Sequence, residues 1–598
     1  MNWLQKFINE TGKNTLWGLA VLMLGGLLLR CWGLDFGLPN DSRPDEYNTI
    51  QVIVENLMTP IVTQGDLSLN PHFFRYPSLY FYFMLPFYFS FYWLLKTQGM
   101  PPVWQEFLMF WVNNPAPFHL ILRWGSVVAG VLMIPAMYGL TMQILKNQPY
   151  QRETAWLSAI LMTVCYLMVR VSHFGGVDTP MTLLVMLALM AIVHFYRVRR
   201  PRARDVACIL IGMAAGIKYP AAVLCVPLWV AIFQPYCNTI ADRIDWPGFA
   251  LEALKATGIT VFVFLLTSPW VVLDVNRFWF DFRYESVHYF GFMLPGLSSG
   301  WVFYATFALF YGVGAWVLAM FLLGVWRSLK CNRQYEHWIL LSFFVAFYIL
   351  LGTNYRVLTR YALPLIPVIL LYASIGVRDS AQLLGEVLRE VFVERLKPYR
   401  FLGAFIVLGA VVLYQPLKTS LAFDTVLGQP DTRVQARNWL LNNLQQPQAV
   451  GVGPRLGQIK LPAQFGQLVI ETGPNNMSGR PPEKIEIADI DFRTKNINTY
   501  ANLPVLKQLG IRYIVLYGGM PLFANPDWEF AALRKQQAVP VFHASPLKAN
   551  ADIEKDMGQF DVLDAFYLPY DKFDAFVSPG PDVTIFDISG SGISEMPN

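Results

Sequence analysis

Charge is the scarcest property of this sequence. Only 15% of the 598 residues are Asp, Glu, Lys or Arg, whereas 55% are hydrophobic and 15% are aromatic. A soluble domain carries about 25% charged residues. The composition therefore excludes an ordinary soluble protein and predicts a polytopic membrane protein. The net charge of +5 comes mostly from a few short basic loops, and this pattern reports membrane orientation rather than nucleic-acid binding.

Cysteine is also scarce, and the spacing of the cysteines matches no metal-binding motif. The six cysteines are scattered and none forms a CxxC pair, so neither a zinc site nor a disulfide framework is indicated. The first apolar run has no small-residue cleavage site, so we interpret it as a retained helix rather than a signal peptide. The carboxyl-terminal part has no Gly-rich phosphate loop, nucleophilic serine elbow or HExxH motif.

Long apolar runs are what the sequence has in abundance. A membrane span requires roughly 20 mostly apolar residues. The sequence predicts about eleven spans, at 15–34, 119–144, 154–172, 180–196, 205–218, 220–234, 254–273, 301–326, 338–353, 361–377 and 401–417.

Basic loops predict the orientation of these spans. The loops at 197–204, 327–333 and 378–400 carry most of the basic residues between spans, and basic loops face the cytoplasm. All three loops face the cytoplasm only if the N-terminus is cytoplasmic and residues 418–598 are outside. We expect a multi-pass protein of a bacterial inner membrane.

One apolar run is predicted not to cross. Residues 78–95 contain many Tyr and Trp residues and an internal Pro, which favours an interfacial helix. Counting this run as a span would place the basic loop 197–204 outside. Residues 35–118 are therefore predicted to form one large external loop within a transmembrane domain at 1–417.

A different kind of sequence follows residue 418. "IRYIVLYG" is typical of a buried strand, and "QAVGVGP", "QLVIETG" and "PDVTIFDI" indicate further short strands. "LPVLKQLG" indicates a helix that ends at glycine. We therefore predict an extracytoplasmic α/β domain at 418–598.

The charged and titratable residues near the spans fall on the external side of this topology. A charge at membrane depth costs several kcal/mol, so each is a functional candidate. They are Asp45, Glu46, Arg75, Arg170, His173, Asp178, Lys218, His288, Arg356 and Arg360.

Each candidate also has a structural interpretation. Arg170, Lys218 and Arg360 are long enough to snorkel to the interface. Asp178 stands where it could cap the following helix. The histidines are compatible with ordinary loop positions. Taken together, cations suit a lipid-linked phosphate, and a carboxylate suits general-base activation of an acceptor.

These segments resemble the GT-C glycosyltransferases, in the branch of protein O-mannosyltransferases and lipid A aminoarabinose transferases. The matching pieces occur in family order and cover nearly the whole chain. They are "GLPNDSRPDEY", "FFRYPSLYFYF", "RVSHFGGVDTPMTLLVMLAL", "GIKYPAAVLCVP", "TRYALPLIPVILLYAS", "DTRVQARNWLLNN" and "LKQLGIRYIVLYG".

The resemblance implies a polyprenyl-phosphate-sugar donor, inversion at the anomeric carbon, and a protein, lipid or glycan acceptor. It implies catalytic roles for Asp45 and its neighbour Glu46. It also implies two further groups: donor phosphate binding by Arg75, Lys218 and Arg360, and an active-site lining of Asp178, His173, Tyr76 and His288.

Two departures from the family pattern matter. The aminoarabinose transferase branch has a Glu where this chain has Phe74, and this segment reads "RYPSL" rather than "KPPL". The Trp-Trp-Asp motif of the metal-dependent oligosaccharyltransferases does not occur, and Asp-x-Asp occurs only at 489–491, outside the predicted transmembrane domain, so we predict no required metal or other cofactor.

Two other functions fit a protein with many spans. A transporter or flippase of lipid-linked sugars would also place cations near lipid phosphate, but it should show inverted repeats and mid-membrane ionisable residues. A non-catalytic envelope assembly protein would not require the constellation of Asp45, Arg75 and Asp178.

Overall fold

The structure is a computed structural model in which two compact units are defined by internal contacts. One unit comprises residues 1–32, 49–91 and 121–421, and the other comprises 33–48, 92–120 and 422–598. The structure describes residues 12–40, 44–99, 103–238, 243–290, 298–331, 334–387, 400–444, 449–452, 459, 461, 466–469, 510–518, 533–534, 538–556, 558–561 and 567–589.

Helices form nearly all of the described chain before residue 444. In chain order they are α2 (Lys13–Cys31), α3 (Pro44–Gln51), η1 (Val52–Met58), α4 (Thr59–Gln64), α5 (Leu79–Thr97), α6 (Trp104–Asn113), α7 (Ala116–Ile144), α8 (Gln151–Val164), α9 (Tyr166–Ser172), α10 (Asp178–Val198), α11 (Pro201–Ile217), η2 (Tyr219–Leu224), α12 (Cys225–Phe233), η3 (Gln234–Tyr236), α13 (Trp246–Thr267), α14 (Trp270–Leu273), α15 (Val275–Phe290), α16 (Gly300–Phe303), η4 (Tyr304–Ala308), α17 (Leu309–Val313), α18 (Ala315–Cys331), α19 (Tyr335–Gly352), η5 (Thr359–Leu365), α20 (Ile366–Val387), α21 (Arg400–Leu427) and α22 (Thr432–Asn443).

Eight of the described helical segments are long and apolar enough to cross a membrane, or up to ten if each of two bent pairs is one span. The predicted class, a polytopic helical membrane protein, is confirmed. The count is lower than the eleven expected, partly because the predicted span 205–218 corresponds to α11, which does not meet the criterion. The ranges that meet it are Lys13–Cys31, Ala116–Ile144, Asp178–Val198, Tyr219–Tyr236, Trp246–Thr267, Tyr335–Gly352, Thr359–Val387 and Arg400–Asn443, with the bent pairs Gln151–Ser172 and Gly300–Lys330.

The aromatic run predicted to lie at the interface forms α5. This helix contains Pro86 and exposes Phe83, Phe87 and Trp93. It is not among the described helices that meet the length and composition criterion for a span. Its position relative to a membrane stays a prediction.

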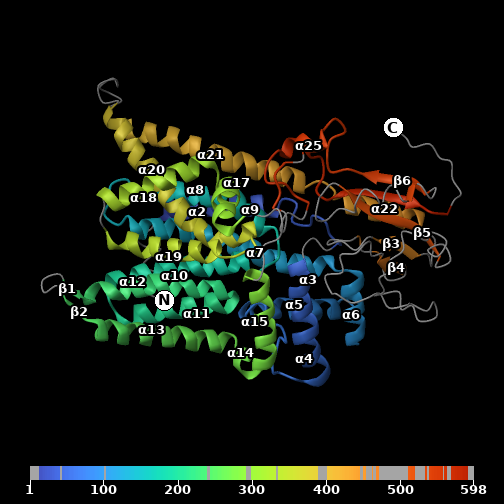
Figure 1. The fold of residues 1–598 in the computed structure, drawn as a ribbon, viewed down its shortest axis with the longest axis horizontal. Helices are drawn as coiled ribbons and strands as arrows, with labels where there is room; N and C mark the ends of the chain where they lie inside the picture. Colours follow the sequence, from blue (N-terminus) through green and yellow to red (C-terminus); the bar gives the residue numbers. More distant parts are fainter. Residues whose placement is uncertain are drawn as a thin grey trace. The chain divides into compact units, whose positions relative to one another are not determined.

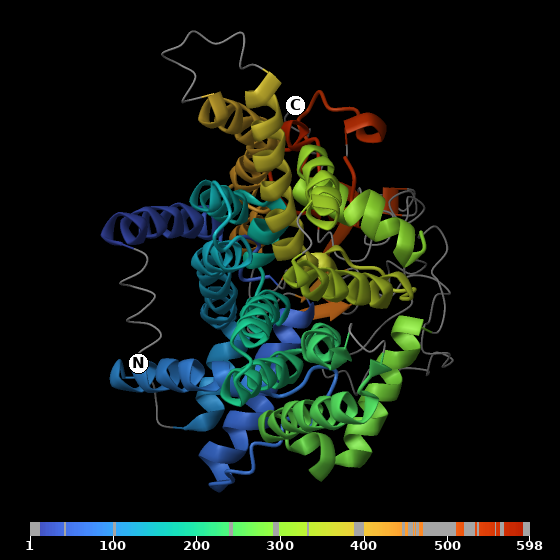
Figure 2. The same ribbon diagram turned by 90° about the vertical axis from the view of Figure 1, so that its left-hand side faces the viewer.

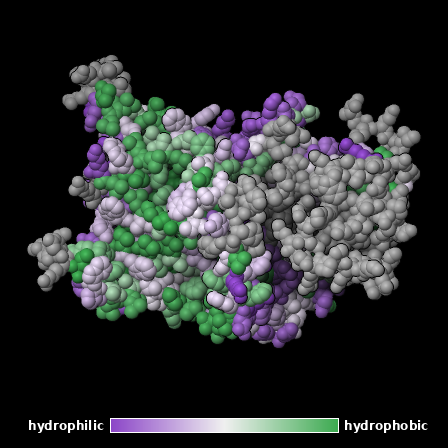
Figure 3. All heavy atoms as spheres, viewed as in Figure 1, coloured by the Kyte–Doolittle hydropathy of each residue, from purple (hydrophilic) through white to green (hydrophobic). Residues whose placement is uncertain are grey.

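The spans of the first unit pack side by side. Figure 1 shows α10, α11, α12 and α13 as a stack of neighbouring helices, and α10 contacts α11 while α11 contacts α13. Figure 2 shows the same group after a quarter turn. Hydrophobic residues dominate the surface over these helices (Figure 3), as expected of spans that face lipid. The short helix α15 runs across the direction of α13 (Figure 1).

The apolar window of the segment Thr359–Val387 is wholly buried, and its helix α20 packs against α18 and α8. This helix approaches α18 closely through two glycines. A Cβ atom at Gly324 would overlap the carbonyl of Tyr372, and one at Gly376 would overlap the carbonyl of Met320. Small residues permit such close backbone contact between spans.

The carboxyl-terminal part contains a five-stranded sheet. Its order is β4-β3-β5-β7-β6, in which β3 is parallel to β4 and β5, while β7 is antiparallel to β5 and β6. The strands are β3 (Ala449–Val452), β4 (Gly466–Val469), β5 (Ile511–Gly518), β6 (Val539–Ala544) and β7 (Asp582–Asp587).

The hydrophobic core of this domain forms where α22 packs on the sheet. Ala436 and Leu440 of the helix join Val450, Val515 and Ile585 of the strands in one buried cluster. The four strands expected from sequence correspond to β3, β4, β5 and β7, so the predicted α/β domain is confirmed. The expected helix in "LPVLKQLG" lies outside the described residues.

Candidate functional site

Three charged side chains predicted from sequence meet in the first unit. The Nζ atom of Lys218 donates to Oδ1 of Asp178 over 2.6 Å. The Nε atom of Arg360 lies 3.5 Å from Oδ2 of the same carboxylate. All three residues are buried, with exposed fractions of 5–6%. The group therefore places two cations on one carboxylate in a setting of low dielectric, where charges interact strongly.

Local structure explains how these residues meet. Asp178 opens α10 and Lys218 directly follows α11, and these two helices run antiparallel because only a short turn joins them. The start of one helix therefore lies beside the end of the other. A carboxylate at a helix start and a cation at a helix end both complement the helix dipole. Arg360 enters from η5, whose residues are all buried.

Two tyrosine rings flank the Lys218 ammonium. The Nζ atom lies 4.1 Å from the centroid of the Tyr361 ring and 5.9 Å from that of Tyr76. The Arg360 guanidinium is also within 5.6 Å of the Tyr361 ring. These distances permit cation–π attraction, so Tyr76 joins the residues around Lys218.

Arg75 contacts a different helix. Its Nε atom is 3.7 Å from Oε1 of Glu285, and its guanidinium lies 4.4 Å from the Tyr284 ring centroid, both on α15. Its predicted role in binding the donor phosphate stays a prediction.

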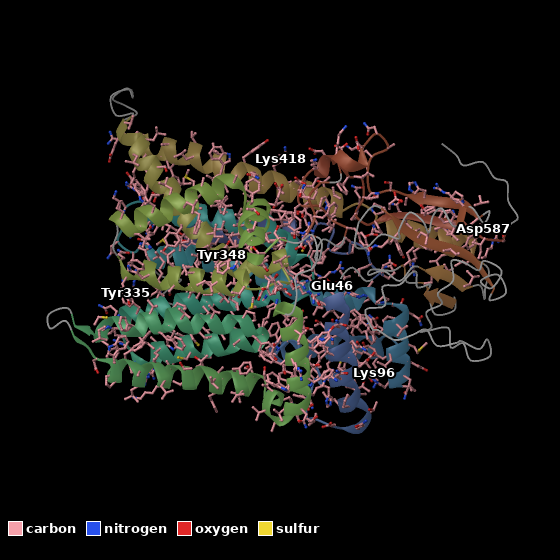
Figure 4. All side chains as sticks on the ribbon, in the orientation of Figure 1. Glu46, Lys96, Tyr335, Tyr348, Lys418 and Asp587 are labelled. Carbon is pink, nitrogen blue, oxygen red and sulfur yellow. The ribbon has the colours of Figure 1, made fainter. Side chains whose placement is uncertain are left out.

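Asp45 and Glu46 lie in the first turn of α3, in the second unit. Glu46 is fully buried, and its Oε2 atom is 3.1 Å from Nδ1 of His119, which is also buried. Figure 4 labels Glu46 on this helix. The next residue, Tyr47, stacks on Trp111 with ring centroids 5.9 Å apart. Asp45 is partly exposed.

The backbone at this pair differs from the sequence-based interpretation. A reading of this stretch as extended chain would point the two neighbouring side chains in opposite directions, but both residues are helical. Neighbouring residues of a helix diverge by about 100°, so Glu46 can contact His119 while Asp45 takes a different direction.

The two predicted lining histidines have different outcomes. His173 is buried at the end of α9, with Nδ1 2.9 Å from the Val169 carbonyl and Nε2 3.2 Å from the Trp32 carbonyl. It is therefore packed among backbone groups rather than in a loop. His288 belongs to α15, but its side chain lies outside the described part of the structure.

Arg30 is a buried charge that the sequence interpretation missed. It donates to the carbonyls of Met162 and Thr163 over 3.2 Å each, at the point where α8 and α9 meet at a 47° bend. Its guanidinium thus satisfies carbonyls that the broken helix leaves without helical partners. A charge within the first apolar run was the available signal.

No group of three or more His, Cys, Asp or Glu residues that could hold a metal ion occurs among the described residues. The expectation that no metal is required stays a prediction.

Comparison with known proteins gives one family-model match and several structural matches. Residues 119–273 match the family model described as dolichyl-phosphate-mannose-protein mannosyltransferase. A comparison with curated proteins gave no significant match. The structure resembles ArnT from Cupriavidus metallidurans bound to undecaprenyl phosphate, with a TM-score of 0.51, 12% identity and coverage of 96% of this chain and 99% of that chain.

Two further structures are similar. Apo ArnT from Cupriavidus metallidurans gives a TM-score of 0.51, 13% identity, and coverage of 96% of this chain and 99% of that chain. The archaeal oligosaccharyltransferase AglB from Archaeoglobus fulgidus gives 0.48, 13% identity, and coverage of 96% and 88%.

The match to ArnT extends over almost the full length of both chains. The fold is therefore similar to that of ArnT, and the fold predicted from sequence is confirmed at this level. The protein is a multi-pass helical membrane protein whose residues 119–273 match the mannosyltransferase family model.

Proposed function

We propose that this protein is an inverting glycosyltransferase that moves a sugar from a polyprenyl-phosphate donor to an acceptor outside the cytoplasm. In this proposal residues 1–417 form the catalytic domain, and residues 418–598 form an external domain that handles acceptors. The protein resides in a bacterial inner membrane, with the N-terminus in the cytoplasm and the loop 35–118 outside.

The observation that carries the proposal is the buried group of Lys218, Arg360 and Asp178. Its two cations converge on one carboxylate, 2.6 Å and 3.5 Å away. Arginine and lysine are strong ligands of phosphate oxygens, and burial strengthens the attraction. A transferred sugar leaves a phosphate monoester behind, whose developing charge such cations stabilise.

The fold supports a lipid-linked phosphate as the ligand. The ArnT structure that this protein resembles contains undecaprenyl phosphate, so a GT-C fold of this length accommodates a polyprenyl chain. The segment at 119–273 that matches the mannosyltransferase family model includes Asp178 and Lys218. We infer that these residues and Arg360 form the donor phosphate site.

The reaction follows from a single displacement. An acceptor oxygen or nitrogen forms a bond to the anomeric carbon, the bond from that carbon to the phosphate oxygen breaks, and polyprenyl phosphate leaves. The proton lost by the acceptor passes to the carboxylate of Asp45, which acts as general base. Attack from the face opposite the leaving phosphate inverts the anomeric centre.

Lipid binding tests the donor site directly. Purified full-length protein should bind undecaprenyl phosphate in detergent or nanodiscs more tightly than undecaprenol, which lacks the phosphate. Lys218→Gln and Arg360→Gln should each weaken phosphate binding by about 10–100-fold, the loss expected for one charge-assisted hydrogen bond. Native mass spectrometry or a fluorescence competition assay measures these affinities.

Arg327→Gln is the matched control. Arg327 lies 3.6 Å from Asp379, which also pairs with Arg378 at 2.8 Å, so this group has the same composition of one carboxylate and two cations. Binding should be unchanged in the control. Equal affinity for undecaprenol and undecaprenyl phosphate, or equal losses in the control and the Lys218 variant, would contradict the proposed donor site.

A further inference from the structure

A network of contacts attaches the segment 68–78 to the helices α14 and α15. The Trp270 indole donates to the carbonyl of Ser68 over 2.9 Å. The Asn70 amide donates to Asp274 over 3.0 Å. This segment carries Arg75 and Tyr76 and leads into α5, so its attachment determines where those side chains lie.

Asp281 makes the most buried of these contacts. Its side chain is only 3% exposed, and its Oδ2 atom accepts the backbone N–H of Phe74 over 2.8 Å. Phe74 itself is fully buried, and its ring meets Phe278 edge to face with centroids 6.1 Å apart. A buried carboxylate bonded to a backbone N–H provides a strong and directional contact.

The backbone carbonyl of Phe74 is also hydrogen-bonded. The Tyr219 hydroxyl donates to the Phe74 carbonyl over 2.9 Å. Tyr219 directly follows Lys218, the cation that contacts Asp178. The peptide groups on both sides of Phe74 are thus fixed, one by α15 and the other by the residue next to the proposed phosphate site.

Three carboxylates on or beside α15 hold the segment. Asp281 and Glu285 are four residues apart on α15, which places them within about 40° of one another around the helix, and Asp274 directly precedes the helix. They contact Asn70, Phe74 and Arg75 in the same order along the chain. α15 and the residue before it therefore attach the segment at three points.

We propose that Asp281 is a positioning residue for the donor site. By accepting the Phe74 N–H, it fixes the backbone that presents Tyr76, whose ring lies 5.9 Å from the Lys218 ammonium. Asp281 acts through Tyr76 and does not touch the lipid phosphate. This inference rests on the proposed donor site at Lys218 and Arg360.

A double-mutant cycle separates this role from a merely structural one. Undecaprenyl phosphate binding is measured for the wild-type protein, Asp281→Ala, Tyr76→Leu and the double variant. Asp281→Ala should weaken binding about tenfold, the lower end for a lost charge-assisted hydrogen bond. Tyr76→Leu should weaken it similarly, and the double variant should lose no more than Tyr76→Leu alone, because coupled residues are non-additive.

Arg277→Gln supplies the matched control. Arg277 lies 3.3 Å from Asp281, and its hydrogen bond in the described structure goes to that carboxylate rather than to the Phe74 backbone. If the bond to Phe74 is what matters, this variant should bind the lipid within twofold of the wild type. An equal loss in Arg277→Gln and Asp281→Ala would overturn the inference in favour of a general effect of the ion pair.

Asp281→Asn is a second variant that keeps the proposal testable if Asp281→Ala fails to fold. Its amide oxygen can still accept the Phe74 N–H. Its binding should fall less than that of Asp281→Ala, and hydrogen exchange of the 72–78 peptide should be faster only in Asp281→Ala.

If the wild type binds undecaprenyl phosphate but the losses of Asp281→Ala and Tyr76→Leu add fully, the inference is wrong and the donor site stands. If the wild type does not prefer the phosphate over undecaprenol, the proposed function itself is wrong.

Discussion

The ammonium of Lys218 lies 2.6 Å from the carboxylate of Asp178, although forty positions separate the two residues in the chain. The contact joins the end of α11 to the start of α10, and Arg360 approaches the same carboxylate from η5. Removing one member of a buried ion pair leaves the other charge without its partner. The Lys218–Asp178 contact therefore yields a prediction about stability that is separate from lipid binding.

Lys218→Met should destabilise the protein by about 3 kcal/mol, the lower end for breaking a buried ion pair. The lower end applies because Arg360 still lies 3.5 Å from Asp178. The double variant Lys218→Met, Asp178→Leu should recover only part of this stability, since it removes the carboxylate that lost its main partner but also takes the ion pair from the buried Arg360. Unfolding in mixed detergent micelles measures the stability.

Neither variant should bind undecaprenyl phosphate as the wild type does. Recovery of both stability and lipid affinity in the double variant would show that the charges serve structure alone. Full stability of Lys218→Met by itself would contradict the importance of the 2.6 Å contact.

Asp45→Asn should reduce transfer from a polyprenyl-phosphate sugar by about 10²–10⁴-fold, the usual contribution of a general base. The variant keeps the size of the side chain, so its folding should be unaffected. Transfer to acceptor, followed with a radiolabelled donor, provides the rate. Near-normal turnover would refute Asp45 as the base.

Glu46→Gln should behave differently, because Glu46 is buried against His119 at 3.1 Å. An amide can retain a hydrogen bond to the imidazole but loses the charge, so we expect a loss of about 1–2 kcal/mol in unfolding free energy with transfer retained within tenfold. Loss of transfer in Glu46→Gln, with Asp45→Asn still active, would assign the base to Glu46.

The carboxyl-terminal domain should show a pH dependence from His543. The Asp582 carboxylate, which lies 3.0 Å from the imidazole, raises the pKa of His543 above its ordinary value of 6.5, against a smaller effect of burial. A raised folded-state pKa stabilises the folded state fully below the unfolded pKa, and this contribution is lost as the pH rises through the folded pKa.

Because both groups are partly exposed, we expect an effect of only about 0.2–1 kcal/mol. Hydrogen exchange of the strand peptide 539–544 in the full-length protein, between pH 6 and 8.5, should reveal faster opening at high pH. Exchange corrected for its intrinsic pH dependence should be flat in His543→Gln. An identical profile in that variant would contradict the ion pair.

Cysteine labelling should establish the topology. In a background without the six native cysteines, Gln98→Cys and Lys555→Cys should react with an impermeant maleimide in intact cells. Arg202→Cys, in the basic loop 197–204, should react only after permeabilisation and is the control. Protection of Gln98→Cys in intact cells would show that the aromatic helix α5 crosses the membrane.

The sequence by itself determined the membrane class and the division between helical and α/β parts. A long apolar run avoids water whichever segments surround it, either by packing in the protein interior or by facing lipid. Length and composition therefore suffice to find most spans. Short apolar runs bounded by Gly, Pro and Asp similarly located the strands β3, β4, β5 and β7. The predicted span at 205–218 corresponds to α11, which has only 17 residues, fewer than the roughly 20 that a span requires.

The tertiary structure decided which charges pair. The sequence placed Asp178, Lys218 and Arg360 on the same predicted side of the membrane, but only packing shows that one carboxylate receives both cations. It also assigned Arg75 to Glu285 and Glu46 to His119. Such contacts depend on distances of a few ångströms between helices far apart in the chain, and residue order fixes the helices without fixing those distances.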